Sequence, residues 1–152
     1  LQIGTPEEIY NFPRNEFVGG LVGDPPMNFF SGEIVADGGQ WYLKTPIFQM
    51  VIKQEMFRVL EGKSLREVRV GLRPSDIFLE RKERDGLFQA EIYVTEPLGV
   101  FQIVSLQAGK EKFQVKYSNT ENFRMGEKVY FGFSPDKLHL FDYATGLNVK
   151  YL

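Results

Sequence analysis

Residues 87–95 have the sequence LFQAEIYVT, in which apolar and polar side chains alternate. Successive side chains of a β-strand point to opposite faces of its sheet, so this alternation predicts a strand with one buried face. The residues expected on the buried face are Phe88, Ala90, Ile92 and Val94. The preceding dipeptide, Asp85-Gly86, is a strong hairpin signal. We therefore expect residues 77–84 and 87–95 to pair with each other around it.

Shorter alternating stretches fill most of the remaining chain and predict further strands. They are residues 29–35, 41–43, 68–72, 101–107, 112–117, 129–133, 138–140 and 147–151. Residues 53–61 differ, because their apolar side chains recur at helical spacing and Gly62 can end the helix. Many short strands, one helix and frequent Gly turns predict a mainly β fold. We expect an OB-like β-barrel, in which residues 108–110 form the turn of another hairpin.

Two short helices are expected before the strands. Residues 5–8, TPEE, combine a capping Thr, a Pro in the first turn and a Glu that can complete a capping box. Pro13 ends this helix, because the residue before a proline is disfavoured in the helical conformation. A second helix is expected from Pro13 to Gly23. Its apolar face consists of Phe17, Val18 and Leu21.

The composition is that of a chain that can bury a core and carries no dominant charge. Apolar residues make up 43% of the 152 residues, which is enough for a compact domain. The 18 basic residues are balanced by 20 acidic ones, so the broad basic field of a nucleic-acid binder is not expected. There is no Cys, which excludes disulfides and thiolate chemistry. No apolar run approaches the about 18 residues that a membrane-spanning helix needs.

Three features suggest chemistry at first sight, and each has a structural explanation. The sequence GKS at residues 62–64 matches only the end of a phosphate-binding loop, and Phe57 stands where that motif needs Gly. His139 is the only His, so no zinc site can be assembled around it, and we expect it to point away from the core. Glu7 and Glu8 suit a helix N-terminus. We predict no catalytic, cofactor-binding or metal-binding residue and no enzyme activity.

A series of short motifs follows in order along the chain. They are GDPPMNF at residues 23–29, VGLRPSDI at 70–77, EPLG at 96–99, GEKV at 126–129 and FSPDKLHLFD at 133–142. Together with residues 2–22, this order resembles the ATP-binding subunits of sugar-type ABC importers, the maltose and glycerol-phosphate group. The second motif departs from the family signature, because its acid, Asp76, comes one residue later. The residues that match the family motifs are Gly71, Arg73, Pro74, Glu96, Pro97, Gly99, His139 and Asp142.

The resemblance implies a C-terminal regulatory domain of the TOBE/MOP type, separated from a catalytic domain. Residues 1–23 would be the helical end of the ATPase domain, and residues 24–152 the OB-like regulatory domain. The nucleotide site, with its ATP and Mg²⁺, would lie upstream, so this chain would hold no cofactor. The intact subunit would form a homodimer and dock on membrane permeases at the cytoplasmic face of the plasma membrane. Some relatives also receive a regulatory protein.

A dimer contact needs exposed apolar side chains with a polar rim. The candidates are Trp41, Tyr93, Phe101 and Phe141, which are aromatic or out of phase with the core. Two other functions stay open. One is a barrel that senses a small ligand, either an oxyanion or a sugar. The other is an OB-fold that stacks single-stranded nucleic acid on aromatic rings, although the charge balance argues against a nucleic-acid partner.

Overall fold

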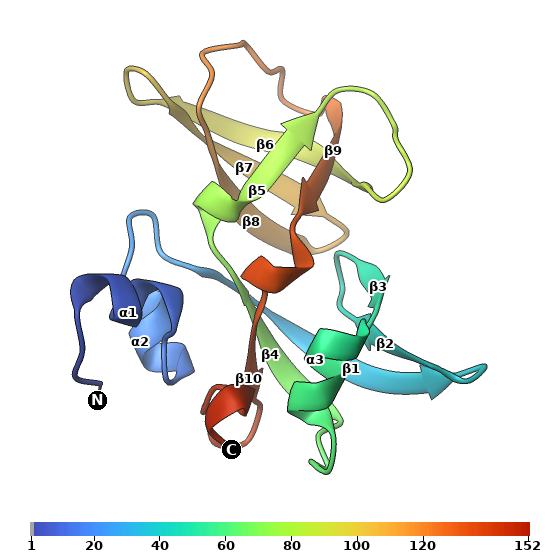
Figure 1. The fold of residues 1–152 in the computed structure, drawn as a ribbon. Coiled ribbons are helices and arrows are strands. Elements are labelled where there is room, and N and C mark those ends of the chain that lie inside the picture. Colours follow the sequence, from blue (N-terminus) through green and yellow to red (C-terminus); the bar gives the residue numbers. More distant parts are fainter. Residues whose placement is uncertain (1) are drawn as a thin grey trace. The chain divides into compact units, whose positions relative to one another are not determined.

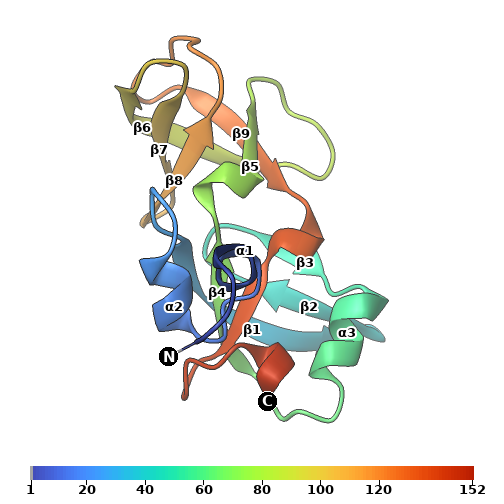
Figure 2. The ribbon, with the colours of Figure 1, turned by 60° about the vertical axis from the view of Figure 1, so that its left-hand side comes forward.

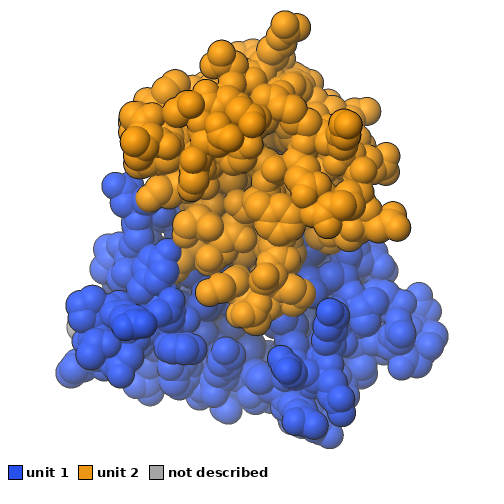
Figure 3. Space-filling view, turned by 45° about the horizontal axis from the view of Figure 1, so that its top comes forward, with its two compact units in different colours: residues 1–71, 139–152 blue, residues 72–138 orange. Residues whose placement is uncertain are grey.

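The computed structural model describes residues 2–152, which form a mainly β protein with short helices (Figure 1). This confirms the predicted fold class. The chain divides into two compact units, which Figure 3 shows in different colours. The first unit comprises residues 1–71 and 139–152, and the second comprises residues 72–138.

The first unit is built on a five-stranded sheet with the strand order β10-β4-β1-β2-β3. Its strands are β1 (Asn28–Asp37), β2 (Gln40–Lys44), β3 (Gln49–Val51), β4 (Glu67–Leu72) and β10 (His139–Asp142). Asp37 of β1 lies opposite Gln40 of β2, so Gly38 and Gly39 form a two-residue turn. Both glycines have positive φ, 57° and 80°, which such a turn requires. β3 has no counterpart among the predicted strands.

Three α-helices flank this sheet within the described residues. They are α1 (Pro6–Asn11), α2 (Glu16–Leu21) and α3 (Gln54–Leu60), and the 3-10 helix η3 (Val149–Tyr151) follows β10. Figure 1 and Figure 2 both show α1 and α2 beside each other and away from α3. The predicted capping box is confirmed, because Thr5 Oγ1 accepts from the Glu8 amide at 3.2 Å and Glu8 Oε2 accepts from the Thr5 amide at 2.9 Å. The helix predicted over residues 53–61 is confirmed as α3.

The second helix begins at Glu16 rather than at Pro13. Asn15 Oδ1 accepts a hydrogen bond from the Val18 amide at 2.9 Å and so supplies the cap. Val18 is buried as predicted, whereas Phe17 and Leu21 are 65% and 70% exposed. The predicted apolar face is therefore wrong for these two residues, since this six-residue helix buries only Val18 and Gly19.

Gly32 lies in β1 at a position where a side chain has no room. A Cβ atom there would lie 2.9 Å from Val70 Cγ2 and 3.2 Å from both Leu43 Cδ1 and Val68 Cγ2. All three neighbours are fully buried, and the two valines are stiff at χ1. We expect Gly32→Ala to lower the free energy of unfolding by about 1–3 kcal/mol, measured by urea denaturation. Glu33→Ala, at the exposed next position, is the control, and equal effects of the two substitutions would contradict this account.

The second unit contains a five-stranded sheet with the order β5-β9-β6-β7-β8. Its strands are β5 (Ile77–Glu80), β6 (Phe88–Pro97), β7 (Gln102–Ala108), β8 (Glu111–Tyr117) and β9 (Lys128–Phe133), with the 3-10 helices η1 (Pro74–Asp76) and η2 (Pro135–Lys137). The edge strands β5 and β8 contact each other, so the sheet curls toward a barrel. The hairpin predicted around residues 108–110 is confirmed, since Ala108 of β7 lies opposite Glu111 of β8.

The hairpin predicted around Asp85-Gly86 is wrong. β5 pairs with β9, and β6 pairs with β9 and β7, so β9 lies between the two strands that were expected to be neighbours. The local turn does form, because the Leu87 amide donates to the Arg84 carbonyl at 3.1 Å and Gly86 has a φ of 86°. A turn sets the chain direction over a few residues, but long-range packing chooses the partner of the next strand.

The predicted faces of β6 hold up to Ile92, and beyond it no residue of the strand is buried. Ala90 and Ile92 are buried, whereas Val94 is 47% exposed. Ile92 lies opposite Leu106 and Val94 lies opposite the next residue, Ser105, so Tyr93 is an extra residue in a bulge. A bulge shifts the alternation of faces by one position, which the sequence pattern did not reveal.

Candidate functional site

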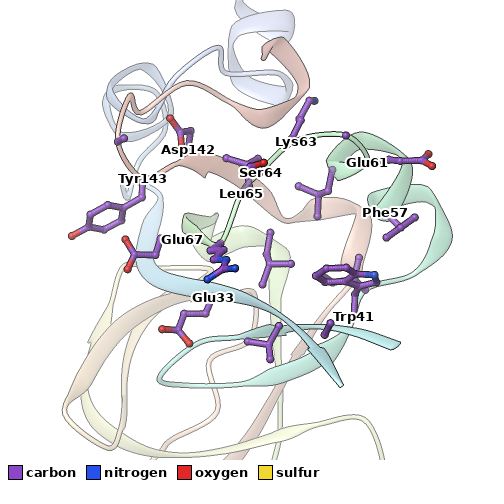
Figure 4. Close-up of a pocket in the computed structure, with 18 residues that line it drawn as sticks. Glu33, Trp41, Phe57, Glu61, Lys63, Ser64, Leu65, Glu67, Asp142 and Tyr143 are labelled. Atoms are coloured by element: carbon purple, nitrogen blue, oxygen red, sulfur yellow. The ribbon is translucent and has the colours of Figure 1, made fainter. Parts of the chain in front are cut away.

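The first unit carries an open groove of about 1030 Å³, seen in close-up in Figure 4. Its lining comes from β1, β2, the link between β3 and α3, the chain from α3 to β4, and the end of β10 with the turn that follows it. The lining residues are 33–36, Trp41, Ile52, Phe57, 60–67 and 142–144. Backbone hydrogen bonding brings two of these segments together, because the Ile34 amide donates to the Arg66 carbonyl at 2.8 Å.

Two aromatic rings form one end of the groove. The ring centroids of Trp41 and Phe57 are 6.2 Å apart, with an angle of 39° between the planes. Trp41 is 42% exposed, so its ring is available to a ligand or a partner. The Ile52 amide donates to the Trp41 carbonyl at 2.8 Å, which ties the start of the α3 segment to β2. Trp41 as a partner contact stays a prediction.

Carboxylates lie elsewhere along the groove. Figure 4 shows Glu33, Glu67 and Tyr143 at the end away from Trp41. Within residues 2–152, no hydrogen bond or ion pair engages the carboxylates of Glu33, Glu61 or Glu67. No motif in the sequence marks these three residues. Glu33 is far along the chain from the other two, and Glu61 and Glu67 are six residues apart, so no local spacing relates them.

Two other charged groups of the groove are already engaged. The Lys63 ammonium donates to the Val149 carbonyl at 2.5 Å. Asp142 Oδ2 accepts hydrogen bonds from the Thr145 amide at 3.1 Å and the Thr145 hydroxyl at 2.6 Å. Asp142, a residue of the family motif, therefore holds the turn after β10.

In the second unit, the predicted contacts Tyr93 and Phe101 both lie on the hairpin of β6 and β7. The Lys112 ammonium lies 3.9 Å from the centroid of the Tyr93 ring, and the Lys116 ammonium lies 4.4 Å from that of Phe101. Such cation–π contacts hold long side chains over ring faces. Each ring therefore has one face covered by a lysine of β8, and the role of both residues as partner contacts stays a prediction.

The tip of the same hairpin is apolar and exposed. Val94 and Leu98 are 47% and 46% exposed, and Val100 is 84% exposed. Gly99 has a φ of 87°, so it supplies the left-handed residue of the turn between these side chains. Glu96 and Pro97, also of the family motif, end β6 and are exposed. Leu98 and Val100 therefore form an exposed apolar surface at the hairpin tip.

Phe141 was expected to be an exposed contact, and this premise is wrong. Its side chain is fully buried, and its ring lies edge-on to Phe29 with centroids 6.0 Å apart. The His139 ring stacks on Phe141 at 6.4 Å and is half-buried, so His139 does not simply point to solvent. Leu140 is buried as well, because β10 is covered on both faces.

The remaining family-motif residues have packing roles. Gly71 of β4 leaves room for Met27, whose Sδ would clash with an added Cβ atom. Arg73 is 2% exposed, and Pro74 starts the 3-10 helix η1. Gly62 follows the end of α3 with a φ of 76°, which confirms a helix end there. These observations explain the motif residues by local structure and assign none of them to a reaction.

The Asp76 carboxyl group lies in the second unit, at the end of the 3-10 helix η1, and is partly buried. Desolvation raises the pKa of Asp76 above its ordinary value of 3.8, and the charges of Lys137 and Arg73 oppose this rise. The folded state therefore binds the proton of the Asp76 carboxyl group more tightly than the unfolded chain does. The contribution of Asp76 to the free energy of unfolding is therefore present at low pH, and it is lost as the pH rises through the raised pKa of the folded state.

We expect Lys137→Met to raise the pKa of Asp76 further, because Lys137 is the largest influence that lowers it. An NMR titration of the Asp76 carboxyl group measures this directly. Lys110→Met, in the exposed turn after β7, is the control and should leave the titration unchanged. An unchanged pKa in the Lys137 variant would contradict the assigned cause.

Within residues 2–152, no group of three or more His, Cys, Asp or Glu side chains is arranged to hold a metal ion. In the same residues no helix has the length and apolar character needed to cross a membrane.

Residues 70–141 match the TOBE domain family. The matched segment is just under half of the chain. It begins within β4 and ends within β10, so it contains every strand of the second unit. The resemblance to sugar importer subunits is confirmed by relatives that match almost the whole chain.

The relatives are ATP-binding proteins of sugar import. The trehalose/maltose import ATP-binding protein MalK of Thermococcus litoralis is 34% identical over 95% of this chain and 40% of its own length. The multiple sugar-binding transport ATP-binding protein MsmK of Streptococcus mutans is 32% identical over 98% of this chain and 40% of its own. The oligosaccharides import ATP-binding protein MsmX of Bacillus subtilis is 32% identical over 98% and 41%. The chain spans about two fifths of the length of these relatives.

A solved structure supports the OB-like fold. The cytoplasmic molybdate-binding protein ModG, with molybdate bound, superposes with a TM-score of 0.59 and 15% identity. The match covers 74% of this chain and 94% of that chain. The predicted OB-like architecture is therefore confirmed.

Proposed function

We propose that the chain is the non-catalytic regulatory and dimerisation part of the ATP-binding subunit of a carbohydrate ABC importer. The observation that carries this proposal is the match of 95–98% of the chain to sugar-import ATP-binding proteins, together with the TOBE family match at residues 70–141. Residues 1–23 are then the end of an ATPase domain, and residues 24–152 are the regulatory domain. ATP and Mg²⁺ bind in the ATPase domain, which works with membrane permeases at the cytoplasmic face of the membrane.

The role of such a domain is mechanical. Two copies hold each other through their regulatory domains while the ATPase domains open and close. A contact of this kind needs an apolar centre and a polar rim. In the second unit, the tip of the β6–β7 hairpin has both, since Leu98 and Val100 are exposed, the neighbouring Phe101 ring lies under the Lys116 ammonium, and Glu96 is exposed at the end of β6. We therefore place the self-contact at this tip.

Sedimentation of the chain tests the proposal. We expect a concentration-dependent dimer, and we expect Val100→Asp to shift the equilibrium at least tenfold toward monomer, because a charge at an apolar contact is desolvated on association. Met125→Asp is the matched control, since Met125 is also an exposed apolar residue, at 78%, in another loop of the second unit. A chain that stays monomeric at high concentration would remove self-association from the proposal. An equal loss of self-association in both variants would contradict the hairpin tip as the contact.

A further inference from the structure

The groove of the first unit offers an apolar ring face at one end and polar side chains, among them Glu33 and Glu67, at the other end. Trp41, at 42% exposure, is tilted by 39° against Phe57, so the two rings form a platform rather than a closed core contact. A pyranose ring presents an apolar face of C–H groups, with its hydroxyl groups around the edge. A flat indole can cover that face and remove it from water.

The polar groups of the groove match hydroxyl groups rather than a single charge. Glu33 and Glu67 supply carboxylate oxygens that only accept hydrogen bonds, whereas Arg66 supplies N–H groups that only donate. Tyr143 adds a phenolic hydroxyl at the same end as the two carboxylates in Figure 4. Each sugar hydroxyl donates one hydrogen bond and accepts others, so it can use both kinds of partner.

Other ligand classes fit less well. An oxyanion would meet four carboxylates, of Glu33, Glu61, Glu67 and Asp142, against two cationic side chains. One of those cations, Lys63, already donates to the Val149 carbonyl. An organic cation would be attracted by these carboxylates and opposed by Arg66, so a cationic probe is the stringent competitor of a neutral ligand. The volume of about 1030 Å³ exceeds what a single ring fills, as expected for a site of more than one sugar unit.

The geometry points to a binding site for a short neutral saccharide in the groove between β1, α3 and the β4 segment, with Trp41 as its stacking platform. This inference concerns the first unit alone and does not depend on dimerisation. It goes beyond transport, because it makes the chain itself a sugar-responsive element.

Trp41 is the only Trp in the chain, so its fluorescence reports this groove directly. We expect maltose or maltotriose to change the Trp41 emission in a saturable way. Sorbitol, which has hydroxyl groups but no ring face, should have at least tenfold lower affinity. Molybdate and argininamide, the anionic and cationic probes, should have no saturable effect. Saturation by molybdate or argininamide but not by the sugars would overturn the inference, as would the absence of any saturable change.

Substitutions of the lining residues test whether the saccharide binds in this groove. Glu33→Ala combined with Glu67→Ala should weaken maltotriose binding about tenfold, from the loss of two hydrogen-bond acceptors. Glu91→Ala, an exposed carboxylate of β6 outside the groove, should leave binding unchanged. Circular dichroism checks that each variant is folded, and Trp41→Ala, followed by calorimetry, provides a second test if the double variant is not. Unchanged binding in Trp41→Ala would contradict the site, whatever the sedimentation result.

Discussion

Phe141→Ala is expected to lower the free energy of unfolding by about 3–5 kcal/mol. The side chain is fully buried, and its ring packs edge-on against Phe29 at 6.0 Å. It also approaches the backbone of α2, since a Cβ atom on Gly19 would lie 3.5 Å from Phe141 Cζ. Truncation leaves a cavity between β10, β1 and α2, and a close-packed interior refills such a cavity only in part.

Urea denaturation of the wild-type chain and the variant measures this loss. Phe17→Ala is the matched control, because Phe17 belongs to the same unit and is 65% exposed. We expect it to change stability by no more than about 0.5 kcal/mol. A Phe141 variant that keeps its stability but loses self-association would restore Phe141 as a surface contact and contradict its burial.

Phe131→Ala is expected to have an effect of the same size in the second unit, about 3–5 kcal/mol. Phe131 is fully buried in β9, the strand between β5 and β6. Its ring centroid lies 4.9 Å from that of Phe113 and 5.6 Å from that of Phe88. The three rings therefore join β9, β8 and β6 in one aromatic cluster, and removal of the central ring opens it.

Amide hydrogen exchange locates this effect, because it reports the opening of individual strands. In the Phe131 variant, exchange should accelerate along β5, β6 and β9. Val100→Ala, at the 84% exposed hairpin tip, is the control for the second unit and should leave exchange in those strands unchanged. Slow exchange in β9 of the Phe131 variant would show that the cluster is not the core of the unit.

Local signals in the sequence were reliable where residues close together in the chain form hydrogen bonds with one another. The capping box of Thr5 and Glu8 forms as predicted, and so does the hairpin of β7 and β8. The turn at Asp85-Gly86 also forms, but the strands on its two sides do not pair. The hydrogen bonds of a turn depend on about four residues, whereas the partner of a strand depends on segments far away along the chain.

The burial of Phe141 shows a second limit of the sequence, which concerns the prediction of burial from an alternating pattern. An alternating pattern assigns one buried and one exposed face, and Leu138 and Leu140 mark the buried face of the segment before Asp142. In the structure both Leu140 and Phe141 are buried. The face of β10 that carries Phe141 is covered by residues from α2 and β1, namely Gly19 and Phe29. No residue near Phe141 in the sequence indicates that this cover exists.

The sequence by itself determined the mainly β class, the capping box of Thr5 and Glu8, the glycine turns and the kinship with sugar-import ATP-binding proteins, because each of these depends on short motifs or on their order. Only the tertiary structure decided which strands are neighbours and where the groove lies. Trp41, Phe57, Glu33 and Glu67 belong to β2, α3, β1 and β4, and these elements meet only when β1, β2 and β4 join one sheet. Side chains that converge in this way carry no common spacing in the chain, since the sheet and not the sequence sets the distances between them.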